Sequence, residues 1–157
     1  MAIDRVKQYF RDRGFEERIR EYEVSSATVE LAAEAAGCEP ARIAKTLSFH
    51  VGNEVILVVA AGDARIDNQK YKARFGCKAK MLAFDEVESA IGHAVGGVCP
   101  FAVNEGVSVY LDETLRRFET VFPACGSDAS AIELTISELE DLSCALEWVD
   151  VCKLREA

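Results

Sequence analysis

The segment with the most unusual composition covers residues 92–101, which we call the glycine loop. It places three glycines and Pro100 within nine residues. Glycine lets backbone N–H groups converge closely on a ligand, and proline fixes the direction in which the chain leaves. Converging N–H groups bind phosphate or stabilise negative charge that develops on an ester carbonyl. The spacing matches neither the Walker phosphate loop nor the dinucleotide fingerprint, so a ligand-binding loop and a plain turn both remain open.

Two further segments carry residues suited to the same chemistry. Lys45 is a single cation in an apolar and small-residue stretch, residues 43–47, and its ammonium could hold a phosphate or a carbonyl oxygen. The alternative is a surface lysine that ends a helix and interacts with the helix dipole. A second small-residue segment, residues 124–128 or the second turn, contains Gly126, Ser127 and Asp128, which could face the same cavity.

Covalent and metal-dependent catalysis are not favoured. Cys99 and His93 lie six residues apart in one loop, and nothing in the sequence orients the histidine as a base. No serine lies in a nucleophile elbow, so a Ser-His-Asp triad is not supported. The six cysteines are scattered without a Cys-x-x-Cys pair, and we expect them to be reduced. Because the two histidines have no closely spaced ligand-type neighbours, we expect neither a metal nor another cofactor.

The charge is distributed unevenly along the chain. The formal net charge is −9, which opposes nonspecific binding to nucleic acid and disfavours a general DNA-binding protein. Residues 65–80, which we call the basic segment, nevertheless contain six basic residues and one acidic residue. Such a segment is compatible with a local phosphate-binding surface or with a solvated helix face. Its candidate contacts to a polyanion are Lys70, Lys72, Arg74, Lys78 and Lys80.

The length and hydropathy limit the class of protein. A chain of 157 residues, half of them hydrophobic, is expected to fold as a single domain, residues 1–157. The longest apolar run, residues 55–61, is far shorter than the roughly 20 residues that cross a bilayer, so we expect no membrane partner. The amino terminus lacks the pattern of a secretory signal. These features predict a cytoplasmic protein.

The elements that must position the candidate residues follow from periodicity and capping signals. Apolar spacing predicts helices over residues 2–13 and 29–36, and a further helix over 68–75 that begins after Asp67. Lys45 is expected at a helix-to-strand junction, just before a hairpin of residues 47–51 and 55–61. Asp85 with Glu88, and Ser137 with Glu140, resemble capping boxes of two later helices. Further strands are predicted over residues 78–82, 107–111, 120–122 and 132–136, and at 146–151 on an edge. The order indicates a single α/β domain whose mixed sheet is curled toward a barrel.

Several of these segments, taken in order, resemble the YbaK family of aminoacyl-tRNA deacylases. The resemblance covers roughly residues 20 to 145, and its most specific part is the combination of Lys-Thr-Leu with Gly-Gly-Val-x-Pro-Phe. It implies a mixed β-sheet barrel surrounded by helices, and hydrolysis of amino acids wrongly attached to tRNA, most often tRNA for proline. The matching segments are residues 21–23, 28–33, 43–47, 62–67, 92–101 and 126–127.

The resemblance also implies roles for individual residues. Lys45 would hold the carbonyl or the terminal phosphate of the substrate, and the amides of Gly96 and Gly97 would bind the ester carbonyl. A positioned water then suffices as nucleophile, because an aminoacyl ester is already activated. The basic segment meeting the acceptor-stem phosphates is a separate hypothesis that the family does not supply. The residues implied to bind substrate are Tyr22, Thr46, Val98, Cys99, Pro100, Phe101, Gly126 and Ser127.

The expected partner is the acceptor end of a mischarged tRNA, and prolyl-tRNA synthetase is a second candidate partner. The chain would then act in trans, on tRNA-Pro carrying Cys, Ala, Ser or another small residue. Cys99 and Ala102 depart from the family pattern, because many relatives have Ser or Pro at the first position and often Gly at the second. Thr46 stands where members that favour alanyl esters tend to have Asn. The alternatives are an inactive module of this fold that senses aminoacyl-tRNA or a small ligand, and a purely structural protein.

Overall fold

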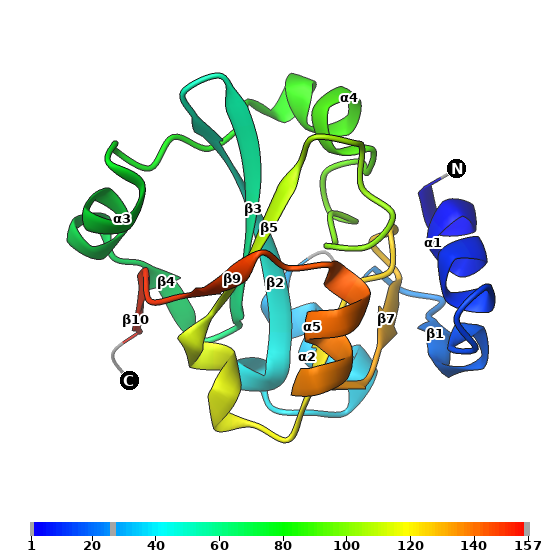
Figure 1. The fold of residues 1–157 in the computed structure, drawn as a ribbon. Helices are drawn as coiled ribbons and strands as arrows, with labels where there is room; N and C mark the ends of the chain where they lie inside the picture. The colour runs from blue at the N-terminus through cyan, green and yellow to red at the C-terminus, as the bar shows by residue number, and fades with distance from the viewer. Residues whose placement is uncertain (1, 26–27, 156–157) are drawn as a thin grey trace.

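A mixed β-sheet curled into a half-barrel forms the centre of this single-domain α/β protein (Figure 1). The computed structural model describes residues 2–25 and 28–155. The six-stranded sheet has the order β8-β6-β2-β3-β5-β9, and two short pairs, β1 with β7 and β4 with β10, extend it. The strands are β1 (Ile19–Glu21), β2 (Ile43–Val51), β3 (Glu54–Ala61), β4 (Ala64–Ile66), β5 (Ser108–Asp112), β6 (Thr120–Pro123), β7 (Ser130–Ile132), β8 (Leu134–Thr135), β9 (Glu147–Val149) and β10 (Cys152–Leu154).

Helices surround the sheet, as expected. In Figure 1, α1 lies beside the loop that follows α4, whereas α3 lies at the opposite side, next to β4 and β10. No helix in the described part of the chain is both long and apolar enough to cross a membrane. The helices are α1 (Ala2–Arg11), α2 (Val29–Ala36), α3 (Asn68–Phe75), α4 (Val87–Ile91) and α5 (Ile136–Ser143), with short 3-10 turns η1 (Glu16–Arg18), η2 (Pro40–Arg42), η3 (Phe84–Glu86) and η4 (Glu113–Arg117).

The predicted hairpin is the backbone of the fold. β2 and β3 pair antiparallel from Ala44–Ala61 to Val51–Glu54, around the predicted turn at Gly52. The apolar run of β3 is almost fully buried, as a central strand covered on both faces should be. Two predicted helix starts are also confirmed, because the side chains of Thr28 and Asp67 accept hydrogen bonds from backbone N–H groups in the first turns of α2 and α3.

The start of β2 and the predicted strand at 78–82 differ from expectation. Lys45 does not lie at a helix-to-strand junction, because β2 begins two residues earlier and contains it. Residues 78–82 form no strand; they contact β2 through a single bridge between Phe49 and Met81. The 78–82 segment does not form a longer ladder because β6 already pairs with the beginning of the same edge of β2, which leaves only the last part of β2 for this segment.

Two predicted capping boxes and one strand are also shifted. Thr135 caps α5 with Glu138, not Ser137 with Glu140, and the predicted strand 132–136 divides into β7 and β8. Near α4 the carboxylate that caps is Glu86, which accepts a hydrogen bond of 2.6 Å from the backbone N–H of Ala83. Each error amounts to a few residues, because several acidic and hydroxyl side chains near these helix starts satisfy the same sequence pattern.

One edge of β2 is left open in its middle. β6 pairs with Ile43 and Ala44, and the 80–82 segment bonds to the backbone of Ser48 and His50. Alternate residues of a strand direct their backbone N–H and C=O groups to the same edge. The backbone groups of Thr46 therefore point to the same edge as those of Ser48 and His50, into the gap between β6 and the 80–82 segment. Among the described residues, no strand pairs with 45–47 on this side. This gap in the sheet positions the candidate site.

Candidate active site

A cavity of about 460 Å³ lies at the open edge of β2. The glycine loop, α2, β6, β7 and the segment 81–87 surround it, so five separate parts of the chain form its walls. Lys45 is the single charged side chain among the residues that line it in the described structure. The other lining residues are Thr28, Val29, Ala32, Ile43, Ala44, Thr46, Leu47, Ser48, Met81, Leu82, Phe84, Val87, Val95, Gly96, Val98, Phe122, Ala124, Ser130 and Ala131.

The ammonium of Lys45 is held in place by the strand that follows the hairpin. Its Nζ donates a hydrogen bond to the backbone carbonyl of Ala64 in β4. Burial lowers the pKa of Lys45, and the nearby guanidinium of Arg155 lowers it further. The negative charge of Asp63 acts in the opposite direction and raises the pKa of Lys45. The carboxylate of Asp63 is itself held by Arg117, which donates two hydrogen bonds of 2.6 and 3.0 Å to it. The lysine is therefore a half-buried cation with a fixed anchor.

The glycine loop and the second turn meet, as the sequence analysis expected. Gly97 approaches the second turn so closely that a Cβ there would lie 2.8 Å from the backbone of Gly126 and Ser127. Gly96 lines the cavity with φ of +93°, a left-handed conformation that suits glycine. Gly97 donates its own N–H to Ala94 at 3.0 Å. Its contribution is thus close approach of two backbones, while Gly96 and Val98 are the loop residues at the cavity wall.

The rest of the glycine loop packs beneath the cavity. Cys99, Pro100 and Phe101 are buried and do not line the cavity, although the sequence analysis placed them among the substrate contacts. Phe101 packs edge-on against Phe10 of α1, with ring centroids 4.8 Å apart. Arg5 of α1 also donates to two loop carbonyls, at 2.8 and 3.1 Å. These residues support the shape of the loop from below.

The structure also explains why Cys99 is not a nucleophile. Burial raises the pKa of its thiol to about 12, and its side chain is fully inaccessible. The Nε2 of His93 lies 3.5 Å from the Cys99 sulfur and 2.7 Å from the carbonyl of Phe101, to which it donates. Burial lowers the pKa of His93, so a neutral imidazole with its proton directed at this carbonyl does not serve as a base for Cys99.

The remaining predicted contacts fall into two groups. Thr46 lines the cavity, and its buried Oγ1 has no hydrogen-bond partner among the described residues. Tyr22 and Ser127 stand behind the wall: Tyr22 donates its backbone N–H to Ala129 at 2.8 Å, and the Ser127 hydroxyl bonds to Ser130 at 2.9 Å. Ser130 itself lines the cavity, and the sequence analysis missed it. Its position three residues after the Gly126–Ser127 pair was the available signal.

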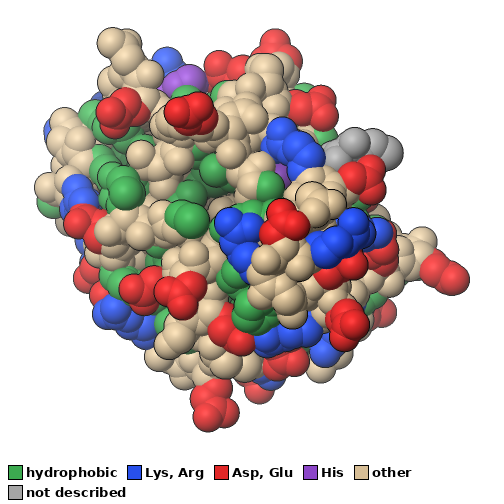
Figure 2. Space-filling view, turned by 45° about the vertical axis from the view of Figure 1, so that its right-hand side comes forward, with side chains coloured by type: hydrophobic (Ala, Val, Ile, Leu, Met, Phe, Trp, Pro, Cys, Tyr) green, Lys and Arg blue, Asp and Glu red, His purple; other side chains and the backbone are tan. Residues whose placement is uncertain are grey.

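The basic segment lies outside the cavity and is partly neutralised. Lys70 pairs with Asp150 at 2.9 Å, and Arg74 pairs with Glu147. Lys72, Lys78 and Lys80 are exposed, and none of these three forms an ion pair within the described residues. Figure 2 turns the side of α1 toward the viewer and that of α3 away, and it shows acidic and basic side chains interspersed over the visible face.

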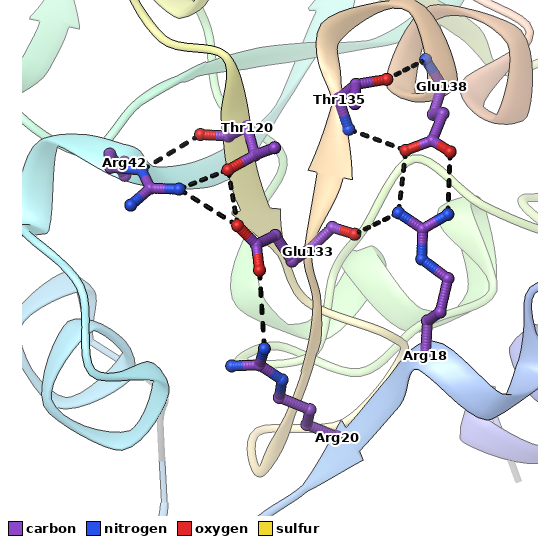
Figure 3. A network of polar contacts seen from close by, with 7 residues as sticks. All are labelled: Arg18, Arg20, Arg42, Thr120, Glu133, Thr135 and Glu138. Atoms are coloured by element: carbon purple, nitrogen blue, oxygen red, sulfur yellow. Dashed lines mark hydrogen bonds and ion pairs between the residues drawn. The ribbon is translucent and has the colours of Figure 1, made fainter.

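A polar network supports the wall of the cavity on its β6 side (Figure 3). One carboxylate oxygen of Glu133 accepts hydrogen bonds from the guanidinium of Arg42 at 3.2 Å and from the hydroxyl of Thr120 at 2.6 Å. The other carboxylate oxygen lies 3.5 Å from a guanidinium nitrogen of Arg20. The guanidinium groups of Arg20 and Arg42 stack over Phe122, which lines the cavity. The network therefore fixes the ring of Phe122 through charges that lie outside the cavity.

The chemistry of this cavity is that of a small, mostly apolar chamber with one cation and a few backbone and hydroxyl groups. No three Cys, His, Asp or Glu side chains gather as metal ligands within the residues that the structure covers. A carbonyl oxygen near Lys45 would meet a fixed positive charge, and the wall at Gly96 and Val98 offers backbone groups. Such a site suits recognition and polarisation of an ester.

Comparison with known proteins identifies the family. A family model of the aminoacyl-tRNA editing domain matches residues 23–142. The chain belongs to this family. The resemblance noted in the sequence is thus confirmed, and the matched region includes Lys45, the glycine loop and the second turn.

Three similar proteins extend this result. The uncharacterized protein YwhH of Bacillus subtilis (strain 168) is 53% identical over 154 residues, which are 98% of each chain. A solved structure of a protein proposed as a trans-editing enzyme for prolyl tRNA synthetase is 30% identical, with a TM-score of 0.87 over 97% of each chain. Proline--tRNA ligase of Bacillus cytotoxicus is 30% identical over 91 residues, which are 57% of this chain and 16% of the ligase.

Proposed function

We propose that this protein hydrolyses the ester of mischarged aminoacyl-tRNA and acts in trans. The observation that carries the proposal is the junction of Lys45, the glycine loop and the second turn around one cavity, in a member of the aminoacyl-tRNA editing family. The similar trans-editing protein covers the whole fold and supports action as a separate chain. The cytoplasm, where aminoacyl-tRNA is used, is the compartment that this function requires.

The residues of the cavity would divide the work of ester hydrolysis. The ammonium of Lys45 attracts the carbonyl oxygen, and the backbone N–H groups of Gly96 and Val98 stabilise the negative charge that develops there. A water oxygen attacks the carbonyl carbon, and the bond from this carbon to the ribose oxygen breaks. The ribose oxygen takes a proton from the water, so the products are the free amino acid and the terminal hydroxyl of the tRNA.

The cavity supports small amino acids on tRNA-Pro as substrates, such as Cys, Ala or Ser. Its walls are mostly Val, Ala, Leu and Ile side chains, with the ring of Phe122 at one side. An apolar chamber of this kind discriminates by volume, with about 1–3 kcal/mol for each added or missing methylene group. The likeness of part of the chain to a proline--tRNA ligase supports tRNA-Pro as carrier, and that synthetase as a partner.

Release of the amino acid from tRNAs charged with Cys, Ala, Ser, Thr and Pro tests the proposal. We expect selective hydrolysis of one mischarged tRNA, at least about 100-fold slower in Lys45→Ala, because a fixed charge at the developing oxyanion is removed. Lys153→Ala, which removes an exposed lysine of β10, is the control and should retain the rate. No hydrolysis of any ester, with tRNA binding intact, would contradict the proposal and indicate a binding module.

The pH dependence provides a second test of the role of Lys45. Because burial lowers the pKa of Lys45, its ammonium loses its proton at a pH below the ordinary value of 10.5. If the charged form polarises the ester, the enzyme-dependent rate falls as pH rises through this lowered pKa. The measurement is the rate of deacylation from neutral to alkaline pH, after subtraction of the uncatalysed rate. A profile that keeps rising in the same way as that of Lys45→Ala would contradict the role.

A further inference from the structure

The mouth of the cavity carries an exposed apolar rim. Phe84 is 79% exposed, Met81 is 56% exposed and Val95 is 46% exposed, and all three line the cavity. Phe84 and Met81 come from the segment before α4, and Val95 comes from the glycine loop. Large exposed hydrophobic groups that gather at one opening mark a binding surface, whereas single ones elsewhere need no explanation. The rim therefore calls for an occupant with an apolar face.

The turn that presents Phe84 is held by hydrogen bonds of the residues on both sides of the ring. Glu86 accepts a hydrogen bond from the Ala83 backbone at 2.6 Å, and the same carboxylate oxygen lies 2.7 Å from Nε2 of His50 in β2. Glu86 also donates its backbone N–H to Ala83 at 3.0 Å. These contacts tie η3 to the sheet on both sides of the aromatic residue. The ring of Phe84 thus stays at the opening although little of it is buried.

The proposed function determines what must lie at this opening. When the aminoacyl group of a substrate occupies the cavity, the ribose that carries this group lies at the mouth. The base attached to the same ribose then lies within one nucleoside length of the mouth. An unpaired base exposes a flat apolar face, and proteins recognise such bases by stacking on aromatic side chains. Lys78 and Lys80 immediately precede the rim and offer positive charge to the adjoining phosphates.

We propose that Phe84 is the stacking platform for the terminal base of the substrate tRNA, with Met81 and Val95 bordering the same base. This inference rests on the proposed function, because the ester in the cavity places the base at the rim. Phe84 then acts on binding of the nucleotide and not on the bond that breaks. Removal of the ring should raise KM for aminoacyl-tRNA by about 5- to 100-fold and leave kcat nearly unchanged, as expected for loss of one stacking contact.

Kinetics with two substrates test this assignment. Phe84→Ala should raise KM for the aminoacyl-tRNA, and Phe84→Trp should restore it. Hydrolysis of the methyl ester of the same amino acid, which has no base, should change far less than hydrolysis of the aminoacyl-tRNA. Leu146→Ala removes another exposed apolar side chain, 64% exposed and outside the cavity lining, and is the matched control. An unchanged KM in Phe84→Ala would overturn the proposal and leave the rim to a protein partner. An equal loss on both substrates would also overturn it.

A binding measurement separates this inference from the proposed function. The probe is a short single-stranded RNA that ends in CC followed by 2-aminopurine, which replaces the terminal adenine of CCA. The fluorescence of 2-aminopurine decreases when this base stacks on an aromatic ring. We expect quenching with the wild type and Phe84→Trp, and none with Phe84→Ala. This result does not require catalysis, so it stands even if no ester is hydrolysed. Equal quenching by the wild type and Phe84→Ala would show that the base stacks elsewhere.

Discussion

The glycine loop is held by contacts with α1 that include one buried aromatic ring, whereas the basic segment is held by pairs of exposed charges. Arg5 and Phe10 of α1 fix the glycine loop, and Gly97 fits against the second turn with no room for a methyl group. Lys70 and Arg74 of the basic segment are instead paired with acids of the β9 region. The first region forms a site through its backbone, and the second offers only the cations that these acids leave unpaired.

Crowding the contact between the two turns should have the largest effect. In Gly97→Ala the new Cβ would meet the backbone at Gly126 and Ser127, so the loop must shift. A displacement of this kind costs about 100-fold in activity, and the overpacking costs about 1–3 kcal/mol of unfolding free energy. Deacylation rates and chemical denaturation measure both. Gly106→Ala, at φ +91° with an open Cβ position, should lose stability but keep its activity.

Removal of the support from α1 should have a smaller effect. Arg5→Met deletes two hydrogen bonds to the carbonyls of Gly92 and Ala102, which costs about 1–3 kcal/mol and lowers kcat several-fold through a looser loop. Arg11→Met, which breaks an exposed pair with Glu16, is the control and should leave kcat unchanged. If both variants have the same kcat, the loop does not depend on α1.

The basic segment contains two kinds of cations: those paired with an acidic side chain and those that form no ion pair among the described residues. Replacing Lys72, Lys78 and Lys80 together by Gln should weaken tRNA binding and reduce the slope of log affinity against log salt by about 0.7–0.9 for each lost phosphate contact. Replacing Lys70 and Arg74 by Gln should leave this slope unchanged and lower the unfolding free energy by up to about 1 kcal/mol for each pair. Equal slopes in both variants and in the wild type would mean that the segment is only a solvated face.

The smallest effect is expected at Ala102, which follows the buried part of the glycine loop. Ala102 has φ of +52°, in the left-handed region that favours glycine. Ala102→Gly removes about 1–2 kcal/mol of backbone strain and increases the entropy of the unfolded chain, so the net gain is up to about 1 kcal/mol. Thermal unfolding measures the gain. Ala94→Gly, in the same loop without positive φ, should lower stability instead.

Much of this architecture was predictable from local patterns. The β2–β3 hairpin, the starts of α2 and α3 and the family follow from periodicity, capping and the ordered motifs. These features depend on residues that are close in sequence or on short motifs that follow one another in order along the chain. The same is true of Lys45, whose place in an apolar stretch identified it as a candidate.

The rest depends on contacts between distant segments. A charge run in the sequence does not reveal that Asp150 and Glu147 neutralise Lys70 and Arg74. Burial of Cys99 beneath the glycine loop and the position of Ser130 at the cavity wall likewise require the folded chain. The open edge of β2 arises because two separate segments pair with its two ends, which no local pattern encodes.

The anchor of Lys45 also has a consequence for the order of synthesis. The carbonyl that receives this ammonium belongs to β4, and the strand that pairs with β4 is β10, at Cys152–Leu154. The ribosome therefore synthesises β10 well after the hairpin, β4 and the glycine loop. A nascent chain whose hairpin and glycine loop have already left the ribosome still lacks β10, the strand that pairs with β4. The surroundings of Lys45 are therefore complete only after residues 152–154 have been synthesised.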